Sequence, residues 1–227
     1  MRRRILFLGA VLLVGAVGLG FFLHIRTSLR VFHHGSPPAF MAYRGPLTPV
    51  QRLIVAGARD QLTWGTGYDA SYCVIGYPKG DVPRTKGACT DVVVRSLRSA
   101  GIDLQAEMHR DISANWSLYP RYNGNPKPDA NIDQRRVPNQ RVFLSRFGIA
   151  LTKKTDKPQD WQPGDIVEWK MPFGHDHTGV LTDHVDRDGL PLVIHNKGNG
   201  PQEEDVLRDW TITGHFRYPK PTGMIRA

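Results

Sequence analysis

The sequence predicts an α+β fold in which helices come first and an antiparallel sheet follows. In the first two thirds of the chain, apolar residues recur at the three- and four-residue spacing of amphipathic helices. In the final third, short runs of β-forming residues are separated by glycine, proline and aspartate turn signals. Segregated helices and strands are typical of the α+β class, so we expect the helices to pack on one antiparallel sheet.

Length and composition allow one ordinary globular domain with appendages. The chain has 227 residues, 40% hydrophobic and 22% charged, which excludes a wholly disordered chain, a collagen-like chain and a polytopic membrane protein. The net charge is +9, but residues 1–30 contain five arginines and no acidic residue, so the rest of the chain carries only +4. Because it shows no dense basic stripe with interleaved aromatic residues, we expect no nucleic-acid partner.

The amino terminus has the pattern of a membrane anchor. Residues 5–23 form an uncharged run of 19 residues, which as a helix is roughly 28 Å long and matches the ~30 Å core of a bilayer. The run follows Arg2, Arg3 and Arg4 and is longer than the core of a usual signal peptide, so residues 1–30 are predicted to be an uncleaved signal anchor.

This anchor predicts a single-pass protein of the cytoplasmic (inner) membrane, with residues 5–23 in the bilayer and the folded part in the periplasm. Secretion after cleavage of the signal is the alternative. Residues 31–45 lack any period and are expected to be a linker, followed by a folded domain over residues 46–220 and a tail over residues 221–227.

A first helix is predicted over residues 49–62. Thr48 fits the N-cap, Pro49 the first helical position and Gln51 the capping-box position. The segment that follows, residues 64–88, is rich in Gly, Pro, Asp and Tyr and is expected to be an ordered loop.

A second helix is predicted to begin at Cys89 and to stop at Gly101, with apolar residues on one face between them. Further helices are expected over residues 107–118 and 142–147. The Pro, Asn and Gly content of residues 119–140 predicts no regular structure there.

Four strands are predicted in the final third, over residues 164–171, 177–186, 191–198 and 213–219. Asp188 and Gly189 between the second and third are a hairpin signal. This hairpin would make neighbours of the strands that carry His177 and His195, with the two imidazoles on one face and the cysteine helix packed across it.

Cys89 is the candidate nucleophile. At the start of a helix the macrodipole and the free backbone N–H groups favour a thiolate, and the same groups can stabilise an oxyanion. Cysteine catalysis also needs an imidazole that takes the proton and a third group that orients it, and His177 and His195 could supply both. The alternative is a small buried residue that caps the helix.

The motifs GACTDVVVRSL, GDIVEW, HTGVLTD and VIHNKG resemble, in this order, those of the papain-like cell-wall cysteine hydrolases of the NlpC type. More closely, residues 46–219 resemble a bacterial family catalogued as domain of unknown function 1287, through the blocks TGYD, GDVP, CTDVV, NIDQRRVPN, PLVIHN, GPQEEDVL and TGHFRY. The resemblance implies a papain-like fold with Cys89 as nucleophile, His177 as base and His195 as the residue that orients it, acting on amide bonds of peptidoglycan without a cofactor.

Supporting roles are expected for Tyr68, Asp91 and Asn196. Tyr68 stands where NlpC-type enzymes often carry a tyrosine near the thiol, and Asn196 is a weaker substitute for His195. Those enzymes often have Ser-Gly after the nucleophile, whereas this chain has Thr90-Asp91, so the local turn differs. Asp91 either caps the helix or contacts substrate.

Three residues of the NIDQRRVPN block, Arg135, Arg136 and Asn139, are expected to bind an anionic group such as a stem-peptide carboxylate. A solvated loop is the alternative.

Other chemistries remain open from the sequence. Cys73 could form a disulfide with Cys89 in an oxidising compartment. His175, His177 and Asp183 could instead form the site of a metal-dependent hydrolase, although His184 would point to the opposite face of a regular strand and we expect no metal. A non-catalytic envelope module that binds wall peptides in the same groove, and acyl transfer in place of hydrolysis, are further alternatives.

Overall fold

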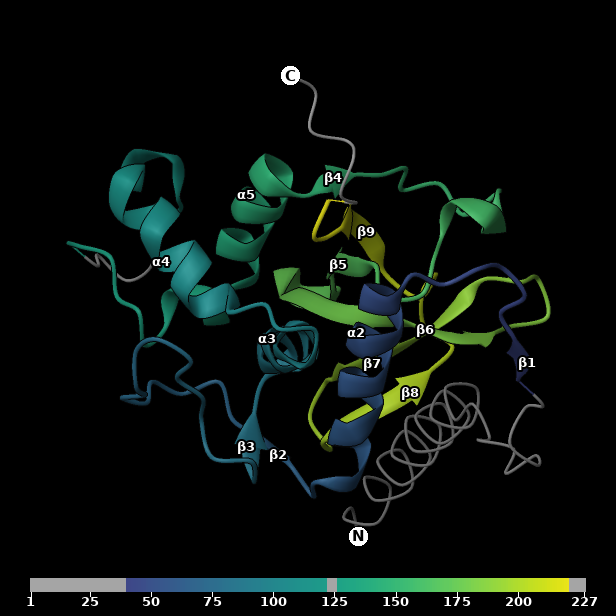
Figure 1. Ribbon diagram of the computed structural model, residues 1–227, viewed down its shortest axis with the longest axis horizontal. Helices are drawn as coiled ribbons and strands as arrows, with labels where there is room; N and C mark the ends of the chain where they lie inside the picture. The colour runs from purple at the N-terminus through teal and green to yellow at the C-terminus, as the bar shows by residue number, and fades with distance from the viewer. Residues whose placement is uncertain (1–39, 122–125, 221–227) are drawn as a thin grey trace, which may run out of the picture. The chain divides into compact units, whose positions relative to one another are not determined.

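The computed structural model describes residues 40–121 and 126–220, which form an α+β arrangement with one antiparallel sheet (Figure 1). The expected anchor over residues 5–23, most of the expected linker and the tail lie outside these residues. Within residues 40–121 and 126–220, no helix has the length and apolar character needed to cross a bilayer.

The main sheet has seven strands and confirms the antiparallel prediction. Six of them follow one another across the sheet, and the remaining strand, β1, pairs with β6. In spatial order the six are β4 (Ile149–Ala150), β9 (Thr211–Arg217), β5 (Ile166–Lys170), β6 (Asp176–Val185), β7 (Pro191–Asn196) and β8 (Pro201–Glu204). A separate parallel pair consists of β2 (Gly67–Tyr68) and β3 (Lys86–Gly87).

Five of the strands in the described residues were not predicted: β1, β2, β3, β4 and β8. β1 (Met41–Ala42) lies in the segment expected to be a linker. β8 has the sequence PQEE, without β-branched or aromatic residues, and it is held by its antiparallel register with β7. The predicted hairpin between β6 and β7 is confirmed, and Gly189 in its turn has a φ of +84° that favours glycine.

The first two helices confirm their predicted starts. α2 (Pro49–Asp60) is followed by a 3₁₀ turn over Gln61–Thr63. Its capping box is complete: the Gln51 N–H donates to Thr48 Oγ1 at 3.2 Å, and the Thr48 N–H donates to Gln51 Oε1 at 2.9 Å. α3 (Cys89–Ser99) begins at the cysteine, as expected.

Both later helices begin earlier than predicted. α4 (Leu104–Ala114) starts three residues before residue 107, because Asp103 caps it by accepting the Ala106 N–H at 3.1 Å. α5 (Val137–Phe147) starts five residues before residue 142, with Pro138 in its first turn. The second half of residues 119–140, predicted to be irregular, thus holds a 3₁₀ turn and the start of a helix.

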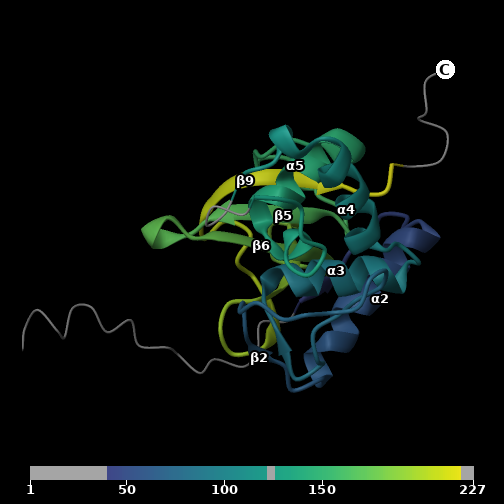
Figure 2. The ribbon, with the colours of Figure 1, turned by 90° about the vertical axis from the view of Figure 1, so that its left-hand side faces the viewer.

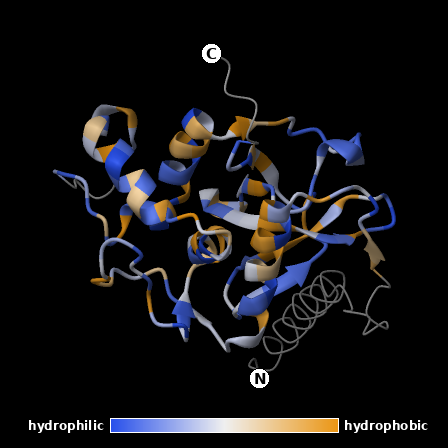
Figure 3. Ribbon diagram, in the orientation of Figure 1, coloured by the Kyte–Doolittle hydropathy of each residue, from blue (hydrophilic) through white to orange (hydrophobic). Residues whose placement is uncertain are grey.

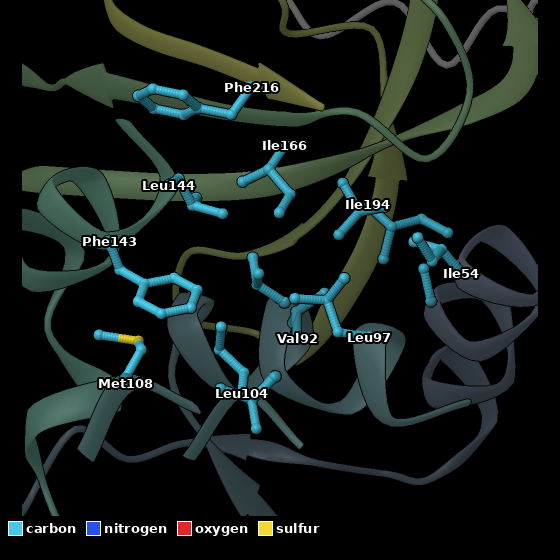
Figure 4. Packing of buried hydrophobic residues seen from close by; sticks show 14 of the residues in the cluster. Ile54, Val92, Leu97, Leu104, Met108, Phe143, Leu144, Ile166, Ile194 and Phe216 are labelled. Carbon is cyan, nitrogen blue, oxygen red and sulfur yellow. The ribbon is translucent and has the colours of Figure 1, made fainter. Parts of the chain in front are cut away.

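The sheet is buried on both faces. On one face, residues such as Ile166, Val180 and Ile194 pack against α2 to α5 (Figure 4). Their sequence neighbours Val167, Leu181 and Val193 belong to a second cluster, which alternation along a strand puts on the other face. Figures 1 and 2 show α2 and α3 side by side, and both contact β6.

Buried strands of this kind read as continuous hydrophobic runs rather than as a clean alternation. Figure 3 shows hydrophobic residues on α2 and along the central strands. Full burial of each large apolar side chain contributes about 1.5–3 kcal/mol, so the first cluster, which includes buried apolar residues of α3, fixes how this helix lies on β6 and β7.

Candidate functional site

Cys89 is the first residue of α3 and is 5% exposed. The helix begins there because the Asp91 carboxylate accepts the Ala88 backbone N–H at 2.6 Å, and Ala88 itself is extended. Asp91 is therefore the cap of this helix, which was one of its two expected roles.

Asp91 is also held by a buried ion pair with Arg135. The guanidinium Nε and Nη2 donate to the two carboxylate oxygens at 2.9 and 3.0 Å, and both side chains are less than 5% exposed. Arg135 further donates to the backbone carbonyls of Ser71 at 2.7 Å and Asp69 at 2.8 Å. These internal bonds make Arg135 a brace beneath the start of α3, and its side chain also lines the hollow next to Cys89. Its expected role as a ligand of an anionic substrate stays a prediction.

The other two expected substrate ligands occupy different environments. Asn139 is 0% exposed and donates to the Asp133 carbonyl at 3.1 Å, so it lies inside the fold. Arg136 is half-buried, lies 3.6 Å from the Asp133 carboxylate, and lines the hollow next to Cys89.

Tyr68 lies beside the cysteine because β2 pairs with β3, the strand that leads into α3. Its side chain is partly exposed and lines the hollow. Burial of the hydroxyl, and after it the negative charges of Cys89 and Asp91, raise the pKa of Tyr68, so this phenol is a neutral hydrogen-bond donor.

Asn196, the last residue of β7, holds the segment that precedes the cysteine. Its amide donates to the Gly87 carbonyl at 3.0 Å, and its side-chain oxygen accepts the Gly198 N–H at 3.2 Å. Asn196 therefore contacts the segment that leads into α3, and not the ring of His177. This differs from its expected role as a substitute for His195.

A hollow of about 340 Å³ opens in front of Cys89. It combines a thiol, a phenol, two guanidinium groups, an imidazole and a carboxylate. The residues that line it include Tyr68, Cys89, Arg136, Pro138, His175 and Asp176.

His177 and His195 meet in one hydrogen bond. The Nε2 of His177 lies 2.7 Å from the Nδ1 of His195, as expected for neighbouring strands. The contact requires the glycine of the His-Thr-Gly motif, because a Cβ on Gly179 would lie only 3.1 Å from the Cβ of His195.

The hydrogen bonds of the histidine pair extend to Glu204 and Lys197, two residues that were not expected in the site. The Nε2 of His195 lies 2.8 Å from a carboxylate oxygen of Glu204, and Lys197 lies 2.7 Å from the same oxygen. Glu204 lies on β8, a strand that the sequence did not predict, and it was not among the expected site residues. The available signal was the GPQEEDVL block, one of the blocks of the family resemblance.

Tryptophans surround the histidine pair. Trp169 pairs with His177 across β5 and β6, with ring centroids 5.8 Å apart and planes inclined by 25°, and Trp210 packs edge-on at 5.7 Å. Burial in this apolar setting, and after it the positive charges of His195 and Lys197, lower the pKa of His177 to about 3. His177 is therefore a neutral imidazole at neutral pH.

The Cys89 thiol is also neutral. Burial raises its pKa to about 12, even though the Thr178 amide and the amides at the start of α3 favour the thiolate. The expectation that the helix start would favour a thiolate is thus outweighed by desolvation. In the part of the chain that the structure describes, no hydrogen bond joins the sulfur to His177, the residue just before Thr178.

The alternatives based on other ligands find little geometric support. Asp183 is paired with Arg59 at 2.6 Å, and His184 lies 3.0 Å from Glu203. Among residues 40–121 and 126–220, no three His, Cys, Asp or Glu side chains converge as a metal site requires. Cys73 and Cys89 are separate free thiols and not a disulfide.

Comparison with known proteins gives two findings. Residues 55–218 match the family model described as domain of unknown function (DUF1287). The chain is also 49% identical over 166 residues to the uncharacterized protein YijF of Escherichia coli strain K12, and the match covers 73% of this chain and 80% of that protein.

Proposed function

The chain belongs to the DUF1287 family, and from this premise we propose that it is a papain-like, NlpC-type cysteine hydrolase that cleaves amide bonds of peptidoglycan. Cys89 is the nucleophile, His177 the general base and His195 the residue that orients the base. The anchor over residues 5–23 would hold the domain at the outer face of the cytoplasmic membrane, within reach of the wall, or would be removed on secretion.

The observation that carries the proposal is the series of hydrogen bonds from His177 through His195 to Glu204. The two histidines lie on β6 and β7, which α3 contacts, and their rings pack against Trp169 of the second cluster. One of the backbone amides that face the Cys89 sulfur belongs to Thr178, so the sulfur lies next to the β6 residue that follows His177. A nucleophile, a base and an oriented third group in this order are the parts that acyl transfer by cysteine needs.

Cys89, His177 and one water molecule account for every bond and proton in the proposed reaction. The Cys89 sulfur attacks the amide carbonyl while its proton passes to the Nδ1 of His177, and the carbonyl oxygen gains the negative charge. The carbon–nitrogen bond then breaks, and His177 returns the proton to the leaving amine. Water attacks the resulting thioester, gives a proton to His177, and the carbon–sulfur bond breaks as the thiol is restored.

The oxyanion would form next to the first turn of α3. Backbone N–H groups of Cys89 and Thr90 point toward the sulfur, and the neutral hydroxyl of Tyr68 lines the same hollow. Because thiol and imidazole are both neutral at rest, substrate binding must bring the sulfur and the Nδ1 of His177 within hydrogen-bond reach.

The hollow suits a peptide that carries both charges. Arg136 and Asp176, which carry opposite charges, line the same hollow as the thiol, and Asp176 is also paired with Arg141 and Lys170. Stem peptides of peptidoglycan carry free carboxylates and free amines, so they match this arrangement better than a uniformly charged polymer would.

The test is mass spectrometry of fragments released from purified peptidoglycan by the full chain in detergent. We expect release by the wild type with or without a chelator, no release by Cys89→Ala, and normal release by the matched control Cys73→Ala. The fragment masses identify the bond. Release by Cys89→Ala contradicts the proposal, and release that a chelator abolishes favours a metal-dependent hydrolase.

One observation favours a second candidate, a non-catalytic module that binds wall peptides in the same hollow. The thiol is buried and neutral and has no hydrogen bond to a base in the described residues. This candidate predicts that wild type and Cys89→Ala sediment equally with peptidoglycan and that neither releases a fragment.

A further inference from the structure

The hydrogen bonds at the histidine pair do not end at His195. The His195 ring is hydrogen-bonded to Glu204 on β8, the edge strand next to β7. Glu204 in turn accepts a hydrogen bond from Lys197. Glu204 lies on the same side of β8 as the histidines, whereas its neighbour Glu203 bonds to Arg59 and faces the other way.

With both rings neutral, the donors and acceptors of this series of hydrogen bonds admit one order. A carboxylate has no proton to give, so the Nε2 of His195 must carry the proton that Glu204 accepts. A neutral imidazole then has only a lone pair at Nδ1, so this atom accepts from the Nε2–H of His177. His177 is left with its proton on Nε2 and a free lone pair on Nδ1.

We propose that Glu204 is a positioning residue that fixes the tautomers of both histidines, so that the basic nitrogen of His177 is Nδ1. The catalytic consequence rests on the proposed function, because Nδ1 is the nitrogen that takes the thiol proton there. The tautomers themselves do not depend on it.

Two contacts of Glu204 stabilise this placement of the protons on the two histidines. Lys197 donates to both Glu204 oxygens at 2.7 and 2.9 Å, which favours the carboxylate. The hydrogen bond from His195, with Lys197 adding to it, lowers the pKa of Glu204 to about 2, so this residue stays an acceptor at every physiological pH.

Burial removes the competition from solvent. His177 is 3% exposed and His195 is 1% exposed, and Trp169 and Trp210 lie against both rings. An imidazole in water exchanges between its tautomers, but a buried one adopts the tautomer that its neighbours impose.

The experiment is nitrogen NMR of the full chain in detergent with ¹⁵N-labelled histidine at pH 7, with His177→Gln and His195→Gln variants to assign the two rings. We expect both wild-type rings in the Nε2–H form. In Glu204→Ala the His195 ring loses its acceptor, so we expect a mixture of tautomers in both rings and a loss of kcat on the order of 10²-fold with KM unchanged.

Two variants separate positioning from folding. Glu204→Gln keeps the shape and an oxygen acceptor, so it should restore the Nε2–H form of both rings and most of the activity. Glu203→Ala, on the same strand but with its side chain on the other face, should change neither tautomers nor kcat.

The outcomes are distinct. An Nδ1–H form in either wild-type ring, or unchanged tautomers in Glu204→Ala, overturns the inference. If the tautomers are as expected but the wild type releases no fragment from peptidoglycan, the positioning role stands and the proposed hydrolase is wrong.

Discussion

Arg135 and Asp91 form a buried ion pair, joined by two hydrogen bonds, directly beneath the residue that begins α3. The same carboxylate accepts the backbone N–H of Ala88 and thereby sets the first turn of the helix. Because Arg135 also binds two carbonyls of the loop after Tyr68, one guanidinium connects the thiol, the tyrosine loop and the α5 region.

Replacement of this guanidinium should act on stability first. We expect Arg135→Met to lower the free energy of unfolding by about 3–5 kcal/mol, because it leaves the Asp91 carboxylate buried without its partner. Lys86→Met, which breaks an ion pair of a mostly exposed side chain with Asp69, should cost about 1 kcal/mol or less. Urea unfolding followed by tryptophan fluorescence measures both, and an Arg135→Met protein of normal stability that fails only to bind peptide would support the substrate-ligand role.

Gly179 leaves the room that His195 occupies. A Cβ at this position would meet the Val193 side chain at 2.6 Å and the His195 Cβ at 3.1 Å. Gly179→Ala should therefore destabilise the fold by about 1–3 kcal/mol and displace His195, with loss of hydrolysis. Gly76→Ala is the control, since its Cβ would meet nothing within 4 Å. An active Gly179→Ala protein with unchanged stability would contradict this account.

Glu168 predicts a pH dependence of stability. Its side chain is fully buried on β5, where desolvation raises the pKa to about 8 although Arg141 lies 2.6 Å away. Between pH 4.5 and 8 the Glu168 carboxyl keeps its proton in the folded chain but has lost it in the unfolded chain. The contribution of Glu168 to the free energy of unfolding therefore falls as pH rises.

The fall should amount to about 3 kcal/mol between pH 4.5 and pH 7. Glu168→Gln, which cannot titrate, should lack it, and the difference between the two urea unfolding curves across this range isolates the effect. Identical pH dependence in wild type and variant would show that Arg141 keeps Glu168 ionised.

The parts of the site that could be predicted are those written in local sequence. Helix caps and the glycine turn between β6 and β7 are short-range patterns, and they sufficed to place Cys89 at a helix start and His177 beside His195. Glu204 was missed because its strand has no β-forming residues and is held only by pairing with β7. The ion pair of Arg135 with Asp91 was not predicted because the two residues lie 44 positions apart in the chain.

The two cysteines give an internal comparison that tests the neutral thiol. Cys73 is partly exposed, whereas the Cys89 thiol is buried and its pKa is raised to about 12, so at pH 7 almost none of it is the reactive thiolate. We expect iodoacetamide to modify Cys89 at least ~10²-fold more slowly than Cys73, and the two equally in urea. Peptide mass mapping over time measures both rates.

The opposite order would carry its own meaning. If Cys89 reacts faster than Cys73 at pH 7, and His177→Gln abolishes the difference, then the resting pair is a thiolate and an imidazolium. In that case the sulfur already contacts the Nδ1 of His177, and substrate binding need not bring the two atoms together, so no closure is required. Slow alkylation that becomes fast when a wall peptide is added would instead support that closure, because only the bound state would bring the base to the thiol.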